Sequence, residues 1–87
     1  MNSSVTKSFR SEFAGLPQAV RAVALKNYRL WRKNPLHPSL HFKRIGPFWS
    51  VRVGMEYRAL GREKDGVLYW FWIGHHRDYD RLVSRGR

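Results

Sequence analysis

The apolar run at residues 67–73 constrains the fold more than any other stretch of this chain, because almost every side chain in it is hydrophobic and four of the seven are aromatic. Glycines bound the run at Gly66 and Gly74, and its length is that of a strand rather than a helix. We expect such a strand inside a sheet or covered on both faces, since neither of its sides suits water. The polar residues that follow at once, 75–79, then lie at the end of a buried strand, where functional groups often occur.

Three further strands are predicted upstream of this run, at residues 40–45, 48–53 and 57–62. The middle one alternates, so that successive side chains point to opposite faces of the sheet. Gly46-Pro47 and the hairpin signal Asp65-Gly66 supply turns between the strands. This order of short strands and turns predicts an antiparallel meander.

Two helical segments come before the strands. An apolar residue at every fourth position, from Val5 to Phe13, predicts a short amphipathic helix that ends near Gly15. Pro17 opens a second helix, since proline is tolerated in a first turn. Asn34-Pro35 ends it, because the residue before a proline is pushed out of the helical region.

These segments predict an α+β fold, in one domain that spans all 87 residues. Residues 1–8 are expected as a frayed polar start, and Asp78 as the N-cap of a short last helix through Val83. The helical hairpin is expected to pack on one face of a four-stranded antiparallel sheet. The other face stays partly open and carries Arg52, Arg58 and the histidine cluster.

The charge of the chain restricts its partners. Seventeen Lys and Arg against six Asp and Glu give a formal net charge of +11. This excess predicts an anionic partner: nucleic acid, an acidic protein, or both. The basic residues are spread along the chain rather than gathered in one segment, which argues against a membrane surface as the partner.

Composition also excludes several chemistries and settings. The absence of cysteine excludes a disulfide framework, a thiolate metal site and a cysteine nucleophile. The first 15 residues lack the apolar region of a signal peptide. No apolar run approaches the roughly 18–20 residues that span a bilayer. We therefore expect a cytoplasmic protein.

Three motifs together have a recognisable pattern. They are Asn-Pro-Leu-His-Pro-Ser-Leu at residues 34–40, Arg-Val-Gly-Met-Glu-Tyr-Arg at 52–58, and Trp-Ile-Gly-His-His at 72–76. With these motifs the chain resembles the RelE/ParE superfamily of bacterial type II toxin–antitoxin toxins over nearly its whole length. The middle motif is the most specific of the three.

The resemblance implies a RelE-like fold of two helices on a small antiparallel sheet. It also implies a cognate antitoxin that wraps and silences the toxin. RelE-type members cut mRNA, often in the ribosomal A site, and need no metal. ParE-type members instead inhibit DNA gyrase.

The resemblance also implies roles for particular residues. Arg58 corresponds to a phosphate and transition-state ligand of RelE-type toxins, and Arg52 to a basic residue on the preceding strand. The basic residue after the last glycine falls at His76 or Arg77. The C-terminal tyrosine used by some members corresponds to Tyr79, at a shorter spacing. Further side chains are expected to bind RNA: Lys43, Arg44, Arg77 and Arg81.

The chemistry of RNA cleavage suits these residue types. Attack by a 2′-hydroxyl needs a base, an acid, and cations around the phosphorane. Histidine transfers protons near neutral pH, so His75 or His76 is the predicted proton carrier. Arginine stays protonated, so Arg52, Arg58 and Arg77 are predicted to hold the phosphate. Adjacent residues leaving a strand point opposite ways, so we expect one histidine to face the site.

Structural roles and a metal site stay open as alternatives at these positions. One histidine of the pair would then merely cap backbone groups, and each arginine would pair with Glu56 or Glu63. A metal site would use His75, His76, Asp78 and His41. No metal-binding spacing supports such a site, so no metal or cofactor is expected.

The primary prediction is a metal-independent mRNA endoribonuclease, the toxin of a toxin–antitoxin pair, with ribosome dependence left open. One alternative is a ParE-like gyrase inhibitor without nuclease activity, which has no need for a histidine beside Arg58. Another is a degenerate module that binds nucleic acid or an antitoxin.

Overall fold

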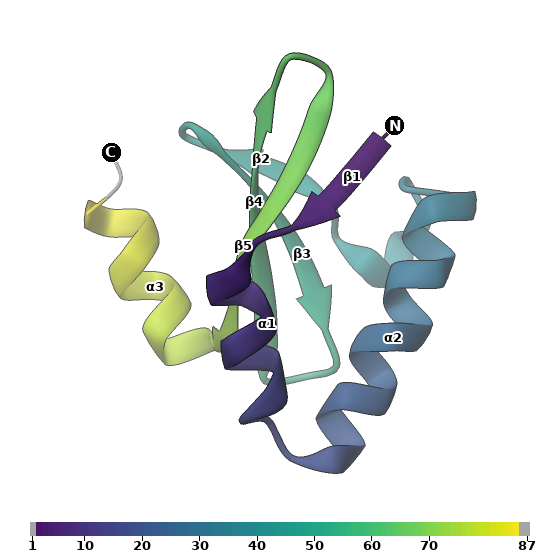
Figure 1. The fold of residues 1–87 in the computed structure, drawn as a ribbon, viewed down its shortest axis with the longest axis vertical. Coiled ribbons are helices and arrows are strands. Elements are labelled where there is room, and N and C mark those ends of the chain that lie inside the picture. Colours follow the sequence, from purple (N-terminus) through teal and green to yellow (C-terminus); the bar gives the residue numbers. More distant parts are fainter. Residues whose placement is uncertain (1, 86–87) are drawn as a thin grey trace.

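The computed structural model describes residues 2–85 and contains a five-stranded sheet, with two helices on one face and a third on the other (Figure 1). The helices are α1 (Lys7–Ala14), α2 (Gln18–Lys33) and α3 (His76–Arg85), with a short 3-10 helix η1 (Pro38–Leu40). The strands are β1 (Asn2–Val5), β2 (Lys43–Ile45), β3 (Phe48–Val53), β4 (Tyr57–Lys64) and β5 (Val67–His75), in the order β1-β5-β4-β3-β2. The α+β class and the presence of three helices are as predicted, but Val5, expected in the first helix, belongs to β1. None of the helices described is long and apolar enough to cross a membrane.

The prediction of four antiparallel strands is wrong at the N-terminus, because Asn2–Val5 forms a fifth strand rather than a frayed start. β1 pairs parallel with β5, with Val5 opposite Trp70, so the sheet is mixed. An Asn-Ser-Ser-Val segment has little β-propensity of its own. Its strand conformation comes from the backbone of β5, whose edge it covers. β5 is thereby an interior strand, as its apolar run predicts.

The strand predicted at residues 40–45 is also shorter than expected. Pro38–Leu40 forms η1, His41 adopts a left-handed conformation with φ of 47°, and the strand begins only at Lys43. Leu40 is fully buried, and the ring of Phe42 stacks on Trp49 at a centroid distance of 4.7 Å. The apolar residues of this segment therefore mark contacts with the core rather than strand alternation.

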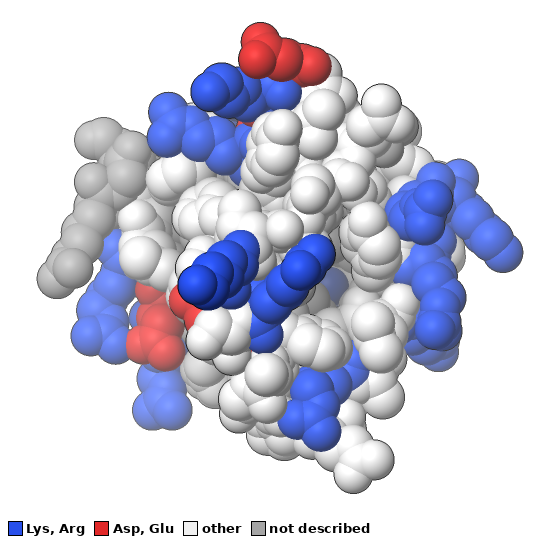
Figure 2. All heavy atoms as spheres, viewed as in Figure 1, with Lys and Arg blue, Asp and Glu red and all other residues white. Residues whose placement is uncertain are grey.

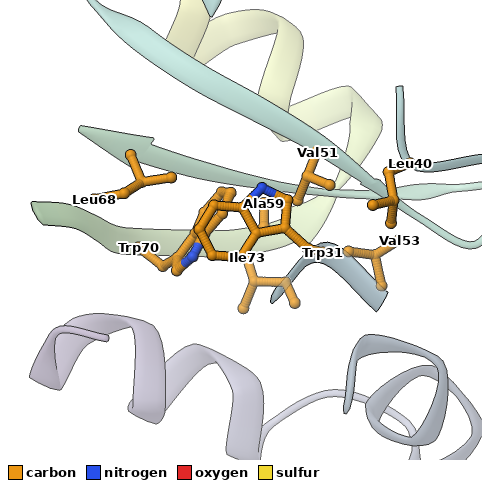
Figure 3. Close-up of a cluster of buried hydrophobic side chains, with 8 residues drawn as sticks. All are labelled: Trp31, Leu40, Val51, Val53, Ala59, Leu68, Trp70 and Ile73. Carbon is orange, nitrogen blue, oxygen red and sulfur yellow. The ribbon is translucent and has the colours of Figure 1, made fainter. Parts of the chain in front are cut away.

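α1 and α2 cover one face of the sheet, which we call the helical-hairpin face. Figure 3 shows its core, where Trp31 of α2 meets Trp70 of β5 edge to face at a centroid distance of 5.4 Å. Phe9 and Phe13 of α1 pack against the same cluster. The predicted helical hairpin on one sheet face is confirmed, and so is the core position of both tryptophans.

Beyond the end of β1, side chains of α1 make hydrogen bonds to the edge of β5. The Ser8 hydroxyl donates to the Phe71 carbonyl at 3.0 Å, and a carboxylate oxygen of Glu12 accepts from the Ile73 N–H at 3.4 Å. Burial raises the pKa of the Glu12 carboxyl, and the hydrogen bond from Ile73 only partly offsets that rise. The free edge of β5 is thus satisfied by polar side chains of a helix.

α3 packs on the opposite face, which we call the α3 face. Leu60 is fully buried in a second apolar cluster with Tyr79 and Val83 of α3. A register shift between Leu60 and Gly61 leaves Phe71 without an opposite residue in β4, and Phe71 joins this second cluster. β5 is therefore covered on both faces, as predicted.

Candidate functional site

Two arginines lie directly opposite each other on the open part of the α3 face. Arg52 of β3 pairs with Arg58 of β4, and Leu60 two residues further along β4 fixes the face on which both side chains lie. Like charges directly opposite in a sheet destabilise it. The pair is therefore a costly arrangement that an anion bound between the two guanidinium groups would relieve.

Gly74 completes the row that begins with these arginines. It lies opposite Arg58, and the indole of Trp72 covers it. A Cβ atom at position 74 would be 2.6 Å from Cζ2 of Trp72. Glycine is thus required here for the indole of Trp72 to keep its position over residue 74, which lies opposite Arg58.

His41 is the histidine that contacts the arginine row. Its Nε2 lies 3.3 Å from Nη1 of Arg52, whose Nε also donates to the Gly54 carbonyl at 3.0 Å. Because a guanidinium can only donate, Nε2 of His41 is the acceptor in this contact. The left-handed backbone of His41 is uncommon for a residue with a side chain and is often found at functional sites.

Sequence reasoning considered His41 only as a metal ligand. The missed role depends on the turn after η1, which brings residue 41 beside β3. The apolar residues of this segment predict a strand over residues 40–45, and no local pattern indicates the turn at His41.

Tyr79 lies beneath Arg58 rather than in the open site. The Arg58 guanidinium carbon is 6.0 Å from the centre of the Tyr79 ring, and Nη1 of Arg58 donates to the Tyr57 carbonyl at 3.2 Å. Tyr79 is only 8% exposed and belongs to the second apolar cluster. The structure therefore brings Tyr79 to the predicted arginine as a support for its guanidinium.

His75 belongs to a different row from the arginines. It lies opposite Tyr57, which lies opposite Val53 of the helical-hairpin face. Nδ1 of His75 accepts from the Arg77 N–H at 3.2 Å, and Nε2 is 3.7 Å from a carboxylate oxygen of Glu56. Both ring nitrogens thus have partners. Nδ1 caps a backbone group at the start of α3, which is the alternative role considered above for one of the two histidines.

α3 begins at His76, so the prediction of Asp78 as its N-cap is wrong. The His75 imidazole caps the helix instead, while Asp78 lies in the first turn and forms an ion pair with Arg81. The guanidinium of Arg77 also contacts Nδ1 of His75 at 3.4 Å. Arg77 and Arg81, both predicted to bind RNA, are exposed, but each has a side-chain partner near the start of α3.

His76 is exposed at the first position of α3. Its backbone N–H donates to the Glu56 carbonyl at 2.8 Å, and its ring centre is 4.5 Å from that of His75. His76 thus follows Gly74 by two residues and has a side chain accessible to a ligand at this end of the sheet.

The two basic residues of β2 lie on opposite faces. Lys43 pairs with Ser50, on the face of Arg52, whereas Arg44 pairs with Trp49. The Arg44 guanidinium carbon lies 5.8 Å from the centre of the Trp49 ring. The structure therefore brings Lys43, but not Arg44, to the face of the arginine pair.

The surface charge extends beyond this site. In Figure 2, blue atoms occur on several sides of the visible surface, notably along the side of α2, whereas red atoms form a few small groups. The exposed basic residues of α2 are Lys26, Arg29, Arg32 and Lys33. A polyanion would therefore be attracted over much of this surface.

Comparison with known proteins places this geometry on a known fold. No family model and no curated protein match the chain. A chain of the RelB–RelE antitoxin–toxin complex from Methanococcus jannaschii does match, with a TM-score of 0.66 and 18% identity over 90% of this chain and 95% of that one. The chain has the fold of RelE toxins.

Other structures with the RelE fold give the same result. The isolated E. coli RelE toxin matches with a TM-score of 0.62 and 16% identity, over 97% of this chain and 96% of that one. The RelBE2 toxin–antitoxin complex from Mycobacterium tuberculosis matches with a TM-score of 0.64 and 22% identity, over 85% and 95%. The resemblance inferred from the three motifs is thus confirmed at the level of the fold.

On this RelE fold, the histidine and carboxylate side chains do not form a metal site. Within residues 2–85, no three His, Asp or Glu side chains lie close enough to hold a metal ion. His75 and Asp78 have other partners, and His41 contacts Arg52. The arrangement instead combines two arginines with a histidine, which suits acid–base chemistry at a phosphate.

Proposed function

We propose that this chain is a RelE-like toxin that cleaves RNA with its own side chains. The observation that carries the proposal is the opposite pair Arg52 and Arg58, with Nε2 of His41 3.3 Å from Arg52. Between residues 2 and 85, neither guanidinium has a carboxylate partner. The positive charge of each is therefore available to the scissile phosphate and to the charge that develops on it.

His41 is the proposed general base. When RNA binds, Arg52 donates to the phosphate instead of to Nε2, and the released lone pair of Nε2 takes the proton of the 2′-hydroxyl. The 2′-oxygen forms a bond to phosphorus while the bond to the 5′-oxygen breaks. The products are a 2′,3′-cyclic phosphate and a 5′-hydroxyl. In the free protein the hydrogen bond from Arg52 holds the imidazole beside the group that binds the phosphate, so the base is already close to the substrate when Arg52 turns to the phosphate.

His76 is the proposed general acid, which gives a proton to the leaving 5′-oxygen. It is exposed and follows Gly74, the residue opposite Arg58. Of the two histidines predicted as proton carriers, His76 keeps this role in the proposal. His75 is instead a structural residue, because its ring nitrogens face α3 and Glu56.

The test is cleavage of single-stranded RNA by the purified protein with a chelator present, both free and on translating ribosomes. Loss of a charge-stabilising donor in Arg58→Ala is expected to slow cleavage about 10²–10³-fold. Loss of the base in His41→Ala is expected to slow it about 10²–10⁴-fold. Lys7→Ala, an exposed charge on α1, is the control for the loss of one positive charge.

Primer extension on cellular mRNA after induction extends the test to the natural substrate. Intact RNA in all these settings, together with altered DNA supercoiling, would instead identify a ParE-like gyrase inhibitor. Intact RNA and unchanged supercoiling would favour a module that only binds nucleic acid or an antitoxin.

The proposed protein partner is a cognate antitoxin. Several of the matching RelE structures are complexes with a RelB antitoxin. A net charge of +11 favours an acidic partner. Binding of such a partner would stabilise the toxin by mass action, so co-expression with the neighbouring reading frame is expected to raise the unfolding temperature.

A further inference from the structure

A second feature of the α3 face lies beyond the end of α3, toward the β4–β5 hairpin. A shallow hollow of about 440 Å³ is lined there by Phe48, Arg62, Lys64, Tyr69 and Phe71. These residues combine three aromatic rings with two cations, and no acidic side chain lines the hollow. None of them belongs to the proposed cleavage site.

The fold explains why these side chains are exposed together. α3 covers Leu60, but Arg62 and Lys64 lie on the same face two and four residues further along β4. Tyr69 lies directly opposite Arg62 and is 39% exposed. The hairpin therefore extends past the helix and presents two cations beside the ring of Tyr69.

The bulge in β5 adds the second wall of the hollow. Phe71, which has no opposite residue in β4, turns to the α3 face and meets Phe48 at a ring-centroid distance of 5.4 Å. Tyr69 therefore lies near two further rings rather than alone. Rings of this kind stack with any nucleobase, because every base has a π face.

The position of the hollow relative to the arginine pair favours RNA as its occupant. Arg62 lies four positions after Arg58 along β4, a distance of roughly 13 Å at the rise of a strand. This distance corresponds to a few nucleotides of a single strand. Because α3 covers Leu60 between the two sites, an RNA strand bound at the arginine pair passes over this helix and places a base several nucleotides away in the hollow.

We propose that the hollow is a subsite for one unpaired nucleotide of the substrate, several nucleotides from the scissile phosphate. The base stacks on Tyr69 and Phe71, while Arg62 and Lys64 bind the flanking phosphates. This inference rests on the proposed RNA cleavage and deepens it. The subsite recognises the form of the substrate, an unpaired strand, rather than its sequence.

The experiment compares cleavage of a trinucleotide with that of a decanucleotide, because only the longer RNA reaches the hollow. Tyr69→Ala is expected to raise KM for the decanucleotide about tenfold, with kcat unchanged and the trinucleotide unaffected. Tyr69→Phe keeps the ring and is expected to restore the wild-type KM. Equal kinetics of wild type and Tyr69→Ala on both RNAs would overturn the subsite.

A binding arm separates failure of the subsite from failure of the cleavage proposal. Affinity for an uncleavable 2′-O-methyl decanucleotide is measured by fluorescence anisotropy, with Tyr69→Ala expected to lose about tenfold. If no RNA is cleaved but this loss is found, the cleavage proposal fails and the nucleotide subsite stands. If Tyr69→Ala weakens antitoxin binding and leaves RNA affinity unchanged, the hollow is a protein contact and the subsite is overturned.

Discussion

The two faces of the sheet come from the same strands but have different chemistry. The helical-hairpin face buries Trp31 and Trp70 beneath two helices, with rings in edge-to-face contact. The α3 face has one helix, which covers Leu60 and leaves cations at both ends of the same strands. Among the described residues, the only buried polar side chain, Ser50, lies on this second face.

This difference separates stability from function within a small domain. A chain of 87 residues has little apolar surface to spare, so one face must supply most of the core. The other face can then keep costly features, such as the opposite arginines Arg52 and Arg58, that a stability optimum would remove. The predictions below ask whether the two faces are as separate as this comparison requires.

The largest expected effect is on the helical-hairpin face. Trp31→Ala should lower the free energy of unfolding by about 3–5 kcal/mol, because it removes a side chain that is 2% exposed. Urea unfolding measures the loss. Trp72→Ala is the matched change on the α3 face, where the indole is only partly buried, and its cost should be clearly smaller. Equal costs would break the comparison.

The second prediction concerns the contact between core and site on the α3 face. Gly74→Ala should cost about 1–3 kcal/mol, because the new Cβ would be 2.6 Å from Cζ2 of Trp72 and must displace the indole. It should also slow RNA cleavage, since Gly74 lies opposite Arg58.

Tryptophan fluorescence and unfolding report the displaced indole in this variant. Gly15→Ala is the control, because a Cβ there comes no nearer than 3.6 Å to the Glu12 carbonyl. If Gly74→Ala is as stable as the wild type, the indole of Trp72 can move without cost. A role of this indole in fixing the geometry of the site would then be ruled out.

Much of this fold follows from periodicity in the sequence. The apolar run predicts an interior strand, and Asp65-Gly66 predicts the hairpin, in which both residues have positive φ values of 53° and 81°. β1 could not be predicted, because its strand conformation depends on the edge of β5 rather than on its own residues. Local propensity gives no information about such a partner.

The candidate site was predictable only where it depends on strand alternation. The spacing of Arg52 and Arg58 across a short turn places both on one face, as the structure has them. Strand alternation does not predict the directions of His75 and His76, because β5 ends at His75 and α3 begins at His76. His41 reaches the arginines through a turn that the sequence does not indicate.

The capping role of His75 gives the third prediction. His75→Ala should lower the free energy of unfolding by about 0.5–2 kcal/mol, because the Arg77 N–H loses its acceptor. His75→Asn restores a side-chain acceptor and should recover most of this loss. Cleavage by folded His75→Asn should stay near that of the wild type, whereas His76→Ala should slow cleavage with little effect on stability. The reverse pattern would exchange the roles of the two histidines.

The smallest expected effect is a pH trend at the helical-hairpin face. Burial raises the pKa of Glu12 above its ordinary value of 4.5, so the folded chain holds this proton more tightly than the unfolded chain. Its contribution to stability is complete below pH 4.5 and is lost as the pH rises through the folded pKa.

Glu12→Gln cannot ionise and keeps an oxygen for the Ile73 N–H, so its stability relative to wild type should increase with pH over this window. Urea midpoints at pH 4 and pH 7 measure the trend, with exposed Glu63→Gln as the control for the lost charge. A difference between Glu12→Gln and wild type that does not change with pH would mean that the carboxyl of Glu12 ionises as readily beneath the helices as it does in water.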